Sequence, residues 1–269
     1  MKFTLKALTV AAAASISTMA FADEGSTSPH SFSGNIGVLS SYDLRGLTNI
    51  PENDNATIQG GLDYEHESGF YAGWWGSTLG YSLKNKATGQ YVAIYNEEGN
   101  ITSYEEIIEE GNKAFENDFY LGYNGSINED LGYTLGLTYY YYFESDAKVN
   151  AAETLVGFNY KDFSLTAQTL LKDVEWGNKG DTYYLGTYSF ALPYDFSLDT
   201  ALGLYSYKKS GKYIESSKES FNFRNFNVGL SKPLADTGVT ASMNYIFGGY
   251  DRDEVKQKNK VVFGLAYNF

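Results

Sequence analysis

The 269 residues are enough for one large domain or two small ones, and a composition of 43% hydrophobic and 20% charged residues is typical of an ordered chain. The 25 Tyr, 17 Phe and 28 Gly beside only 4 Pro favour β-strands. The lack of cysteine excludes disulfides, thiol nucleophiles and Cys-ligated metals, and the net charge of −13 argues against a nucleic-acid partner because such a surface repels phosphate.

The N-terminal segment predicts a secretory signal peptide. Lys2 and Lys6 precede an apolar stretch over 7–20, and Ala20-Phe21-Ala22 forms an Ala-x-Ala cleavage site. We therefore expect a cleaved signal peptide over 1–22, a periplasmic leader over 23–32 and an outer-membrane β-barrel over 33–269. Removing Lys2 and Lys6 from the 20 basic residues leaves 18 against 33 acidic ones, a net charge of −15. The alternative, an N-terminal core helix, fits poorly with the abrupt polar switch after residue 22.

The rest of the chain alternates between apolar and polar residues with a period of two, and its apolar runs are separated by turn residues. This pattern predicts twelve strands, at about 34–45, 55–66, 69–82, 115–125, 131–143, 152–161, 163–172, 181–192, 196–208, 221–232, 238–248 and 259–269. None of the helical-period stretches is long enough to be a main element.

The predicted connections alternate between long and short. Those over 46–54, 83–114, 144–151, 173–180, 209–220 and 249–258 are long or charged, whereas those over 67–69, 125–130, 161–162, 193–195 and 233–237 are tight. Outer-membrane barrels have short periplasmic turns and longer extracellular loops. The predicted fold is therefore all-β, a transmembrane antiparallel up-and-down barrel of twelve strands, with a soluble sheet as the alternative.

The predicted strands have one apolar face. In the last strand Val261, Phe263, Leu265, Tyr267 and Phe269 share a side, and the fifth and eleventh strands repeat the pattern. Tyrosines near strand ends predict the aromatic girdles of a membrane barrel, namely Tyr139 to Tyr142, Tyr183, Tyr184, Tyr205 and Tyr207. Tyr267 and the final Phe269 resemble the signal read by the outer-membrane barrel assembly machinery, which is thus an expected partner.

Three segments resemble a known family. These are NIGVLSSYDLRG at 35–46, ATIQGGLDYEHESGFYAGWWGS at 56–77 and ENDFYLGY at 116–123. They are similar to the TorF family, a proteobacterial outer-membrane family of porin-like proteins whose function is largely uncharacterised. Asn55 stands where that family has proline, and Ser41 stands where an acid or asparagine usually precedes the tyrosine. The resemblance implies a porin-like barrel, and it is loose beyond Tyr123.

If Ile36, Val38, Tyr42 and Leu44 face lipid, alternation directs charged residues inward, where they avoid a cost of roughly 2 to 4 kcal/mol near the bilayer midplane. The candidate lumen and selectivity residues are Asp43, Arg45, Asp63, Glu65, Glu116, Asp118, Glu153, Lys172, Asp199 and Lys260. Seven carboxylates against three cations predict a neutral to weakly cation-preferring pore. The set forms either a charged constriction that selects solutes or a salt-bridged plug that makes a narrow barrel rigid.

The long connection over 83–114 predicts a short helix, because Ser103 and Glu106 fit a capping box and Gly111 fits a helix stop. Such a helix would act as a gate over the mouth or as a solvated lid. We expect no catalysis, since His66 with Ser68 lies beside a short turn and no G-x-S-x-G or H-E-x-x-H motif occurs.

The expected function is passive diffusion of small hydrophilic solutes or ions across the outer membrane of a Gram-negative bacterium. The alternative is a plugged structural or adhesion barrel that acts through its extracellular loops. We expect lipid, lipopolysaccharide and small solutes as partners, and neither a cofactor nor a metal.

Overall fold

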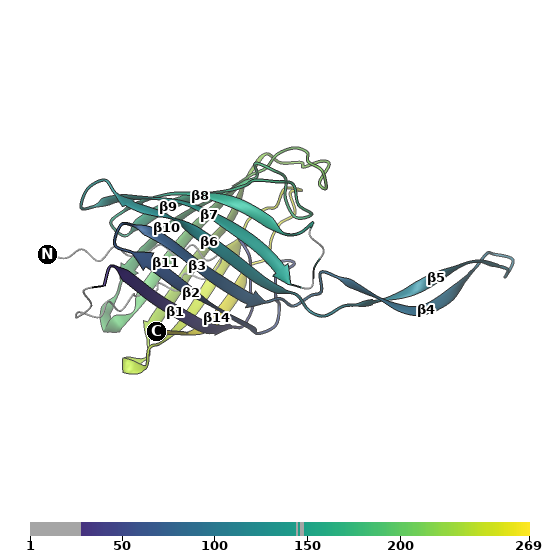
Figure 1. The fold of residues 1–269 in the computed structure, drawn as a ribbon, viewed down its shortest axis with the longest axis horizontal. Coiled ribbons are helices and arrows are strands. Elements are labelled where there is room, and N and C mark those ends of the chain that lie inside the picture. Colours follow the sequence, from purple (N-terminus) through teal and green to yellow (C-terminus); the bar gives the residue numbers. More distant parts are fainter. Residues whose placement is uncertain (1–27, 144, 146–147) are drawn as a thin grey trace.

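The computed structural model describes residues 28–143, 145 and 148–269, so the predicted signal peptide lies outside the described residues. Twelve antiparallel strands close into a barrel in the order β1-β14-β13-β12-β11-β10-β9-β8-β7-β6-β3-β2 (Figure 1). The barrel strands are β1 (His30–Leu39), β2 (Thr57–His66), β3 (Phe70–Thr78), β6 (Phe115–Ser126), β7 (Leu131–Phe143), β8 (Ala151–Tyr160), β9 (Phe163–Leu170), β10 (Thr182–Ala191), β11 (Ser197–Ser206), β12 (Phe221–Pro233), β13 (Val239–Gly248) and β14 (Lys260–Asn268).

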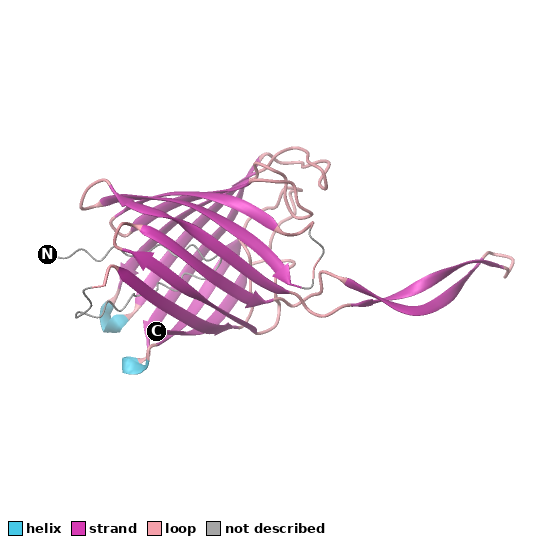
Figure 2. Ribbon diagram, viewed as in Figure 1, coloured by secondary structure: helices cyan, strands magenta, loops and turns pink. Residues whose placement is uncertain are grey.

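The predicted alternation of connections is present in the barrel. One end, the tight-turn end, carries the short turns and the C-terminus, and two of its turns contain the 3-10 helices Pro193–Asp195 and Ala235–Thr237 (Figure 2). The opposite end, the long-loop end, carries the connections over 40–56, 79–114, 144–150, 171–181, 207–220 and 249–259. β1 begins at His30, so the last three residues of the predicted leader belong to the barrel.

The first and last strands close the barrel. Asn35 pairs with Asn268 and Leu39 with Gly264. Gly34 and Phe269, the residue after β14, exchange two backbone hydrogen bonds of 2.8 and 2.9 Å. The Phe269 ring covers Gly34, where an added Cβ would lie 2.6 Å from the ring Cζ atom. Glycine at position 34 thus leaves room for the Phe269 ring to pack against the seam between β1 and β14.

The strands expose apolar side chains outward and bury small or polar ones inward, as alternation predicts. In β7 the outward residues Leu135, Leu137, Tyr139, Tyr141 and Phe143 are all exposed, whereas the neighbouring Thr134 is buried in the lumen. β14 repeats the pattern with Val261, Phe263, Leu265 and Tyr267. An all-round apolar belt on a closed barrel with a polar interior is the arrangement that suits a lipid bilayer.

The prediction of a helix in the long connection is wrong. Residues Asn85–Tyr95 and Ile101–Glu110 form strands β4 and β5, a two-stranded hairpin that projects away from the long-loop end (Figure 1). Ser103 pairs with Ile94 and Glu106 with Tyr91, so the capping box does not form. The β-branched and aromatic residues of both arms favour pairing across a turn at 96–100, and this preference overrides a four-residue capping signal.

Candidate functional site

Loop 40–56 leaves β1 and folds into the mouth of the barrel. β1 ends at Leu39, six residues before its predicted end, and Tyr42 then pairs with Asn53 through backbone hydrogen bonds of 2.8 and 3.1 Å. Arg45 and Gly46 have φ values of 49° and 70°, which reverse the chain inside the mouth. Gly46 packs on β12, because an added Cβ would lie 2.5 Å from the Cβ of Asn225.

Loop 40–56 is anchored to the connection between β13 and β14. Thr48 Oγ1 donates to the Lys258 carbonyl at 2.6 Å, and Asn49 Nδ2 donates to the Lys256 carbonyl at 2.8 Å. Lys260 Nζ donates to Ser41 Oγ at 2.6 Å and pairs with Asp54 at 2.7 Å. These contacts tie the loop to the rim of the barrel beside β1.

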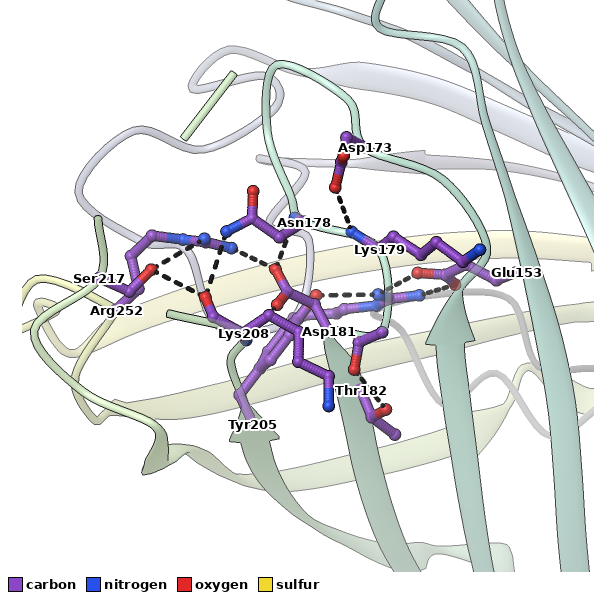
Figure 3. Close-up of polar contacts among 12 residues, drawn as sticks. Glu153, Asp173, Asn178, Lys179, Asp181, Thr182, Tyr205, Lys208, Ser217 and Arg252 are labelled. Carbon is purple, nitrogen blue, oxygen red and sulfur yellow. Dashed lines mark hydrogen bonds and ion pairs between the residues drawn. The ribbon is translucent and has the colours of Figure 1, made fainter. Parts of the chain in front are cut away.

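Arg45 lies at the centre of the mouth and joins the opposite wall. Its guanidinium nitrogens donate to both Glu153 carboxylate oxygens, at 2.8 and 2.5 Å, and to the Tyr140 hydroxyl at 3.2 Å. It also contacts the Tyr205 hydroxyl at 3.4 Å and lies 5.2 Å from the centroid of the Tyr183 ring. Two of these partners, Glu153 of β8 and Tyr205 of β11, are labelled in Figure 3. Such bidentate pairing is geometrically specific.

The Arg45 backbone is held by a residue that the sequence reasoning missed. Arg224 Nε donates to the Arg45 carbonyl at 2.9 Å. The register between β11 and β12 shifts at Gly203, which pairs with Asn225 while Leu204 pairs with Phe223, so Arg224 is the extra residue of a β-bulge. Bulges re-aim side chains next to functional sites. The outward-facing Phe223 was the available signal that its neighbour Arg224 faces inward.

Tyrosines fill the mouth around Arg45. Tyr42, predicted to face lipid, is wholly buried and packs edge-on against Trp75 at 5.6 Å between ring centroids. Five of the predicted girdle tyrosines also point into the lumen and are buried, namely Tyr140, Tyr142, Tyr183, Tyr205 and Tyr207, whereas Tyr139 and Tyr141 face outward as predicted. Alternation within Tyr139 to Tyr142 sends every second ring inward, and a run of identical residues conceals that division.

Three acids in the mouth have no cation at ion-pair distance among the described residues. Glu116 and Asp118 lie two residues apart on the inner face of β6, and Glu52 comes from loop 40–56; all three side chains are buried. Tyr142 donates to Glu116 Oε1 at 3.0 Å, and Tyr81 donates to Glu52.

Several polar atoms of these acids and of the neighbouring Tyr42 have no hydrogen-bond partner. Glu116 Oε2, Asp118 Oδ1 and the Tyr42 hydroxyl have no hydrogen-bond partner in the described structure. Burial, followed by the negative charges of Glu116 and Asp118, raises the pKa of Tyr42 well above its usual value. The mouth therefore holds three buried acids without an ion-pair partner among the described residues, beside the Arg45–Glu153 pair.

Asp43 also lies in loop 40–56 and is buried. Its nearest cation is Lys260, whose Nζ lies 3.5 Å from Asp43 Oδ1. Burial raises the pKa of Asp43 to about 6, and Lys260 opposes that shift. The exposed Asp54 differs, because its hydrogen bond to Lys260 lowers its pKa.

The raised pKa of Asp43 gives an expected pH dependence. Between about pH 3.8 and 6 the folded chain holds a proton that the unfolded chain has released, so this group makes stability fall as pH rises through that window. We expect Asp43→Asn to remove this component, so that the variant gains stability over the wild type as pH rises from 4 to 6. Denaturant unfolding in micelles at several pH values measures it, and a constant difference between the two proteins would contradict it.

Three further acids, Asp63, Glu65 and Asp199, lie nearer the tight-turn end. Asp63 and Asp199 accept hydrogen bonds from hydroxyl groups. Tyr120 donates to Asp63 Oδ1 at 2.5 Å. Asp199 accepts from Ser189, Ser197 and Ser231 at 2.7, 3.0 and 3.0 Å. Glu65 is half-buried on β2, two residues from Asp63. These acids lie apart from the mouth set, so the ten predicted lumen residues do not form one cluster.

Lys172 does not line the lumen. β9 ends at Leu170, and Lys172 is exposed in the following connection. That connection instead joins a second network at the long-loop end, shown in Figure 3, that was not predicted. Arg252 pairs with Asp181 at 2.6 Å and donates to Ser217 at 3.2 Å, while the backbone nitrogen of Lys208 donates to Asp181 at 2.7 Å. Three connections, over 171–181, 207–220 and 249–259, are thereby tied together.

Metal-binding, catalytic and membrane-spanning features were also considered in the sequence, and the structure bears on each. Within the described part of the chain, no three acids or histidines lie close enough together to hold a metal ion. At the β2–β3 turn, His66 Nδ1 lies 2.8 Å from Ser68 Oγ and accepts from the Ser68 backbone nitrogen at 3.1 Å, which is a local turn contact. Among the same described residues, no helix has the length and apolar character needed to cross a membrane.

Comparison with known proteins places this geometry in context. The KdgM porin superposes with a TM-score of 0.50 at 7% identity, covering 88% of this chain and 98% of that one. The NanC porin gives 0.46 at 9% identity with coverage of 88% and 98%. Outer-membrane phospholipase A from Escherichia coli gives 0.41 at 10% identity with coverage of 87% and 88%. No curated protein matches the sequence significantly.

The likeness to the KdgM porin concerns the fold alone, a closed antiparallel β-barrel of twelve strands. A sequence model for a family described as "Bacterial protein of unknown function (Gcw_chp)" matches residues 23–266. The match spans most of the chain and all barrel strands up to the last residues of β14. The chain is therefore a member of the Gcw_chp family of bacterial proteins.

Proposed function

We propose that this protein is an outer-membrane channel for passive diffusion of small hydrophilic solutes or ions, with its mouth narrowed by loop 40–56. The observation that carries the proposal is the polar, charged interior of a closed barrel whose outer face is apolar. A plug that made the barrel rigid would pair its buried acids with cations, whereas Glu52, Glu116 and Asp118 have no cation at ion-pair distance among the described residues. In the orientation that is usual for outer-membrane barrels, the tight-turn end would face the periplasm and the long-loop end would face the outside of the cell.

The proposal includes a Gram-negative outer membrane, contact with lipid and lipopolysaccharide, and insertion by the barrel assembly machinery through Tyr267 and Phe269. The resemblance to the TorF family supports the same role. A neutral to weakly cation-preferring pore is favoured because Glu52, Glu116 and Asp118 have no cationic partner at ion-pair distance among the described residues. The structure adds Arg224 and Arg252 to the sequence-based count, but it also adds Glu52 and Asp181 and places Lys172 outside the lumen, so acids still outnumber cations.

Solute flux through proteoliposomes tests the channel directly. We expect vesicles that contain the folded protein to swell in an isotonic sugar solution faster than vesicles without protein, with smaller sugars entering faster. A folded, inserted barrel that gives the same swelling rate as empty vesicles would overturn the channel proposal. Heat-modifiable migration on a gel, which separates folded from unfolded barrels, provides the control for insertion.

A second candidate function rests on the projecting β4–β5 hairpin. Its exposed residues include Tyr91, Tyr95, Tyr104 and Ile108, and a two-stranded hairpin alone is marginal in water. An interaction barrel that acts through this hairpin would be silent in the swelling assay. Deleting 86–109 would then abolish its activity while leaving the barrel folded, whereas the channel proposal expects flux to survive that deletion.

A further inference from the structure

The chain contains two histidines, and the structure brings their rings close together at an interplanar angle of 54°. His30 of β1 pairs in register with His66 of β2 at the tight-turn end, and their ring centroids lie 5.1 Å apart. The strands run side by side at the near wall of the barrel (Figure 1). Two imidazoles this close, in a chain without other histidine or any cysteine, form an isolated pair of nitrogen ligands.

The strand pairing explains the closeness of the rings. The Glu67 backbone nitrogen donates to the Pro29 carbonyl at 2.8 Å, which makes 29 and 67 a hydrogen-bonded pair. Pairs alternate along an antiparallel ladder, so His30 and His66 occupy the next, non-hydrogen-bonded position, where the Cα atoms approach to about 4.5 Å. Both side chains point to the outer face, beside Phe32 and Tyr64, and His30 is exposed to solvent.

Hydroxyl groups hold one nitrogen of each ring. His30 Nδ1 lies 2.8 Å from the Tyr64 hydroxyl, and His66 Nδ1 lies 2.8 Å from Ser68 Oγ. The two Nε2 atoms have no hydrogen bond among the described residues. Partners that fix the second nitrogen of a metal-binding histidine orient its ring and select its tautomer. For Nε2 to bind a metal, His66 Nδ1 carries the proton and donates to Ser68 Oγ, giving up its contact with the Ser68 backbone nitrogen.

We propose that His30 and His66 form a two-histidine site for a divalent transition-metal ion, with water completing the coordination. Metal–nitrogen bonds of about 2.0 to 2.1 Å place the centroids of two imidazoles on a tetrahedral ion about 5 Å apart, as found for this pair. Imidazole ligands favour Cu²⁺ most, followed by Ni²⁺ and Zn²⁺, and do not suit Ca²⁺ or Mg²⁺. A bound ion would link the first strand to the second.

Titration with Cu²⁺ tests the site in the folded, untagged protein in micelles. We expect one ion per chain, with nitrogen hyperfine splitting from two imidazoles in the electron paramagnetic resonance spectrum. His30→Ala and His66→Ala should each weaken binding at least about tenfold, because losing even a group that orients a ligand costs about 10- to 100-fold. Tyr64→Phe, which keeps both rings, should weaken binding less than either.

Controls separate this site from adventitious binding. The His30→Ala/His66→Ala double variant measures binding to the terminal amine and carboxylates. Asp130→Asn removes an exposed acid at the same end, where it pairs with Lys161 at 3.8 Å, and should leave the titration unchanged. Cu²⁺ affinity that is equal in the wild type and the double variant, or that falls with Asp130→Asn alone, would overturn the proposal. Both imidazoles lie on the surface, so the variants are expected to fold.

Discussion

Replacing Arg45 with alanine is expected to lower the free energy of unfolding by about 3 to 5 kcal/mol, the usual cost of leaving one member of a buried ion pair alone. Glu153 is 1% exposed and receives two hydrogen bonds from Arg45, so the variant leaves this carboxylate buried with only the Tyr140 hydroxyl as donor. Guanidinium unfolding in micelles, followed by the fluorescence of Trp74, Trp75 and Trp176, measures the loss.

Replacing the other member of the pair, Glu153, should lower the free energy of unfolding by less. Glu153→Gln keeps the shape of the side chain, and Arg45 remains close to the other acids of the mouth. The double variant Arg45→Ala/Glu153→Gln should recover part of the stability lost in Arg45→Ala, because the buried charge is gone. If Arg45→Ala costs less than about 1 kcal/mol, the pair behaves as a solvent-exposed ion pair, and the described packing of the mouth is wrong.

Neutralising Glu116 and Asp118 together is expected to reduce cation preference. A unit charge about 4 Å from an ion contributes about 1 kcal/mol in a water-like medium, so each carboxylate changes the local cation concentration by up to about fivefold. Glu116→Gln/Asp118→Asn should therefore move the reversal potential in a KCl gradient at pH 8 toward zero. Both acids are buried in the mouth, each has one oxygen without a hydrogen-bond partner, and neither has a cation at ion-pair distance among the described residues.

Asp199→Asn is the matched control for the selectivity prediction. Asp199 is equally buried but accepts from three serines, and it lies near the tight-turn end. We expect its neutralisation to change the reversal potential little. A larger shift for Asp199→Asn than for the double variant would place selectivity at the other end of the barrel.

Much of the barrel was predictable because the alternation of apolar and polar residues indicates which side chains of a strand face outward and which face inward. The predicted strands over 131–143 and 221–232 nearly match β7 and β12, and the tight turns follow the short polar breaks. The period-two pattern does not show where a strand ends and stops pairing with its neighbours. Tyr42 suits a lipid-facing position in a strand continued to residue 45, yet β1 ends at Leu39 and the chain bends at residue 40, so Tyr42 is buried in the lumen.

The mouth was only partly predictable. Asp43, Arg45, Glu116, Asp118 and Glu153 were candidates, and the structure buries all five there. Their partners depend on contacts between distant segments, as when Arg45 reaches Glu153 across 108 positions of sequence. The role of Arg224 depends on a bulge, which shifts alternation by one residue, and its trace in the sequence is that Phe226 rather than residue 225 follows Phe223 as the next apolar position.

The central claim is that loop 40–56 narrows a channel, and single-channel conductance of a loop-shortened variant tests it most directly. Tyr42 and Asn53 already face each other across a backbone pair, so a two-residue turn such as Asn-Gly can replace 43–52 and close the ladder. Glu153→Gln in the same variant avoids leaving an unpaired buried carboxylate, and Glu153→Gln alone is the control. The account predicts discrete openings of larger conductance than the control; equal conductance, or silence in both folded proteins, would contradict it.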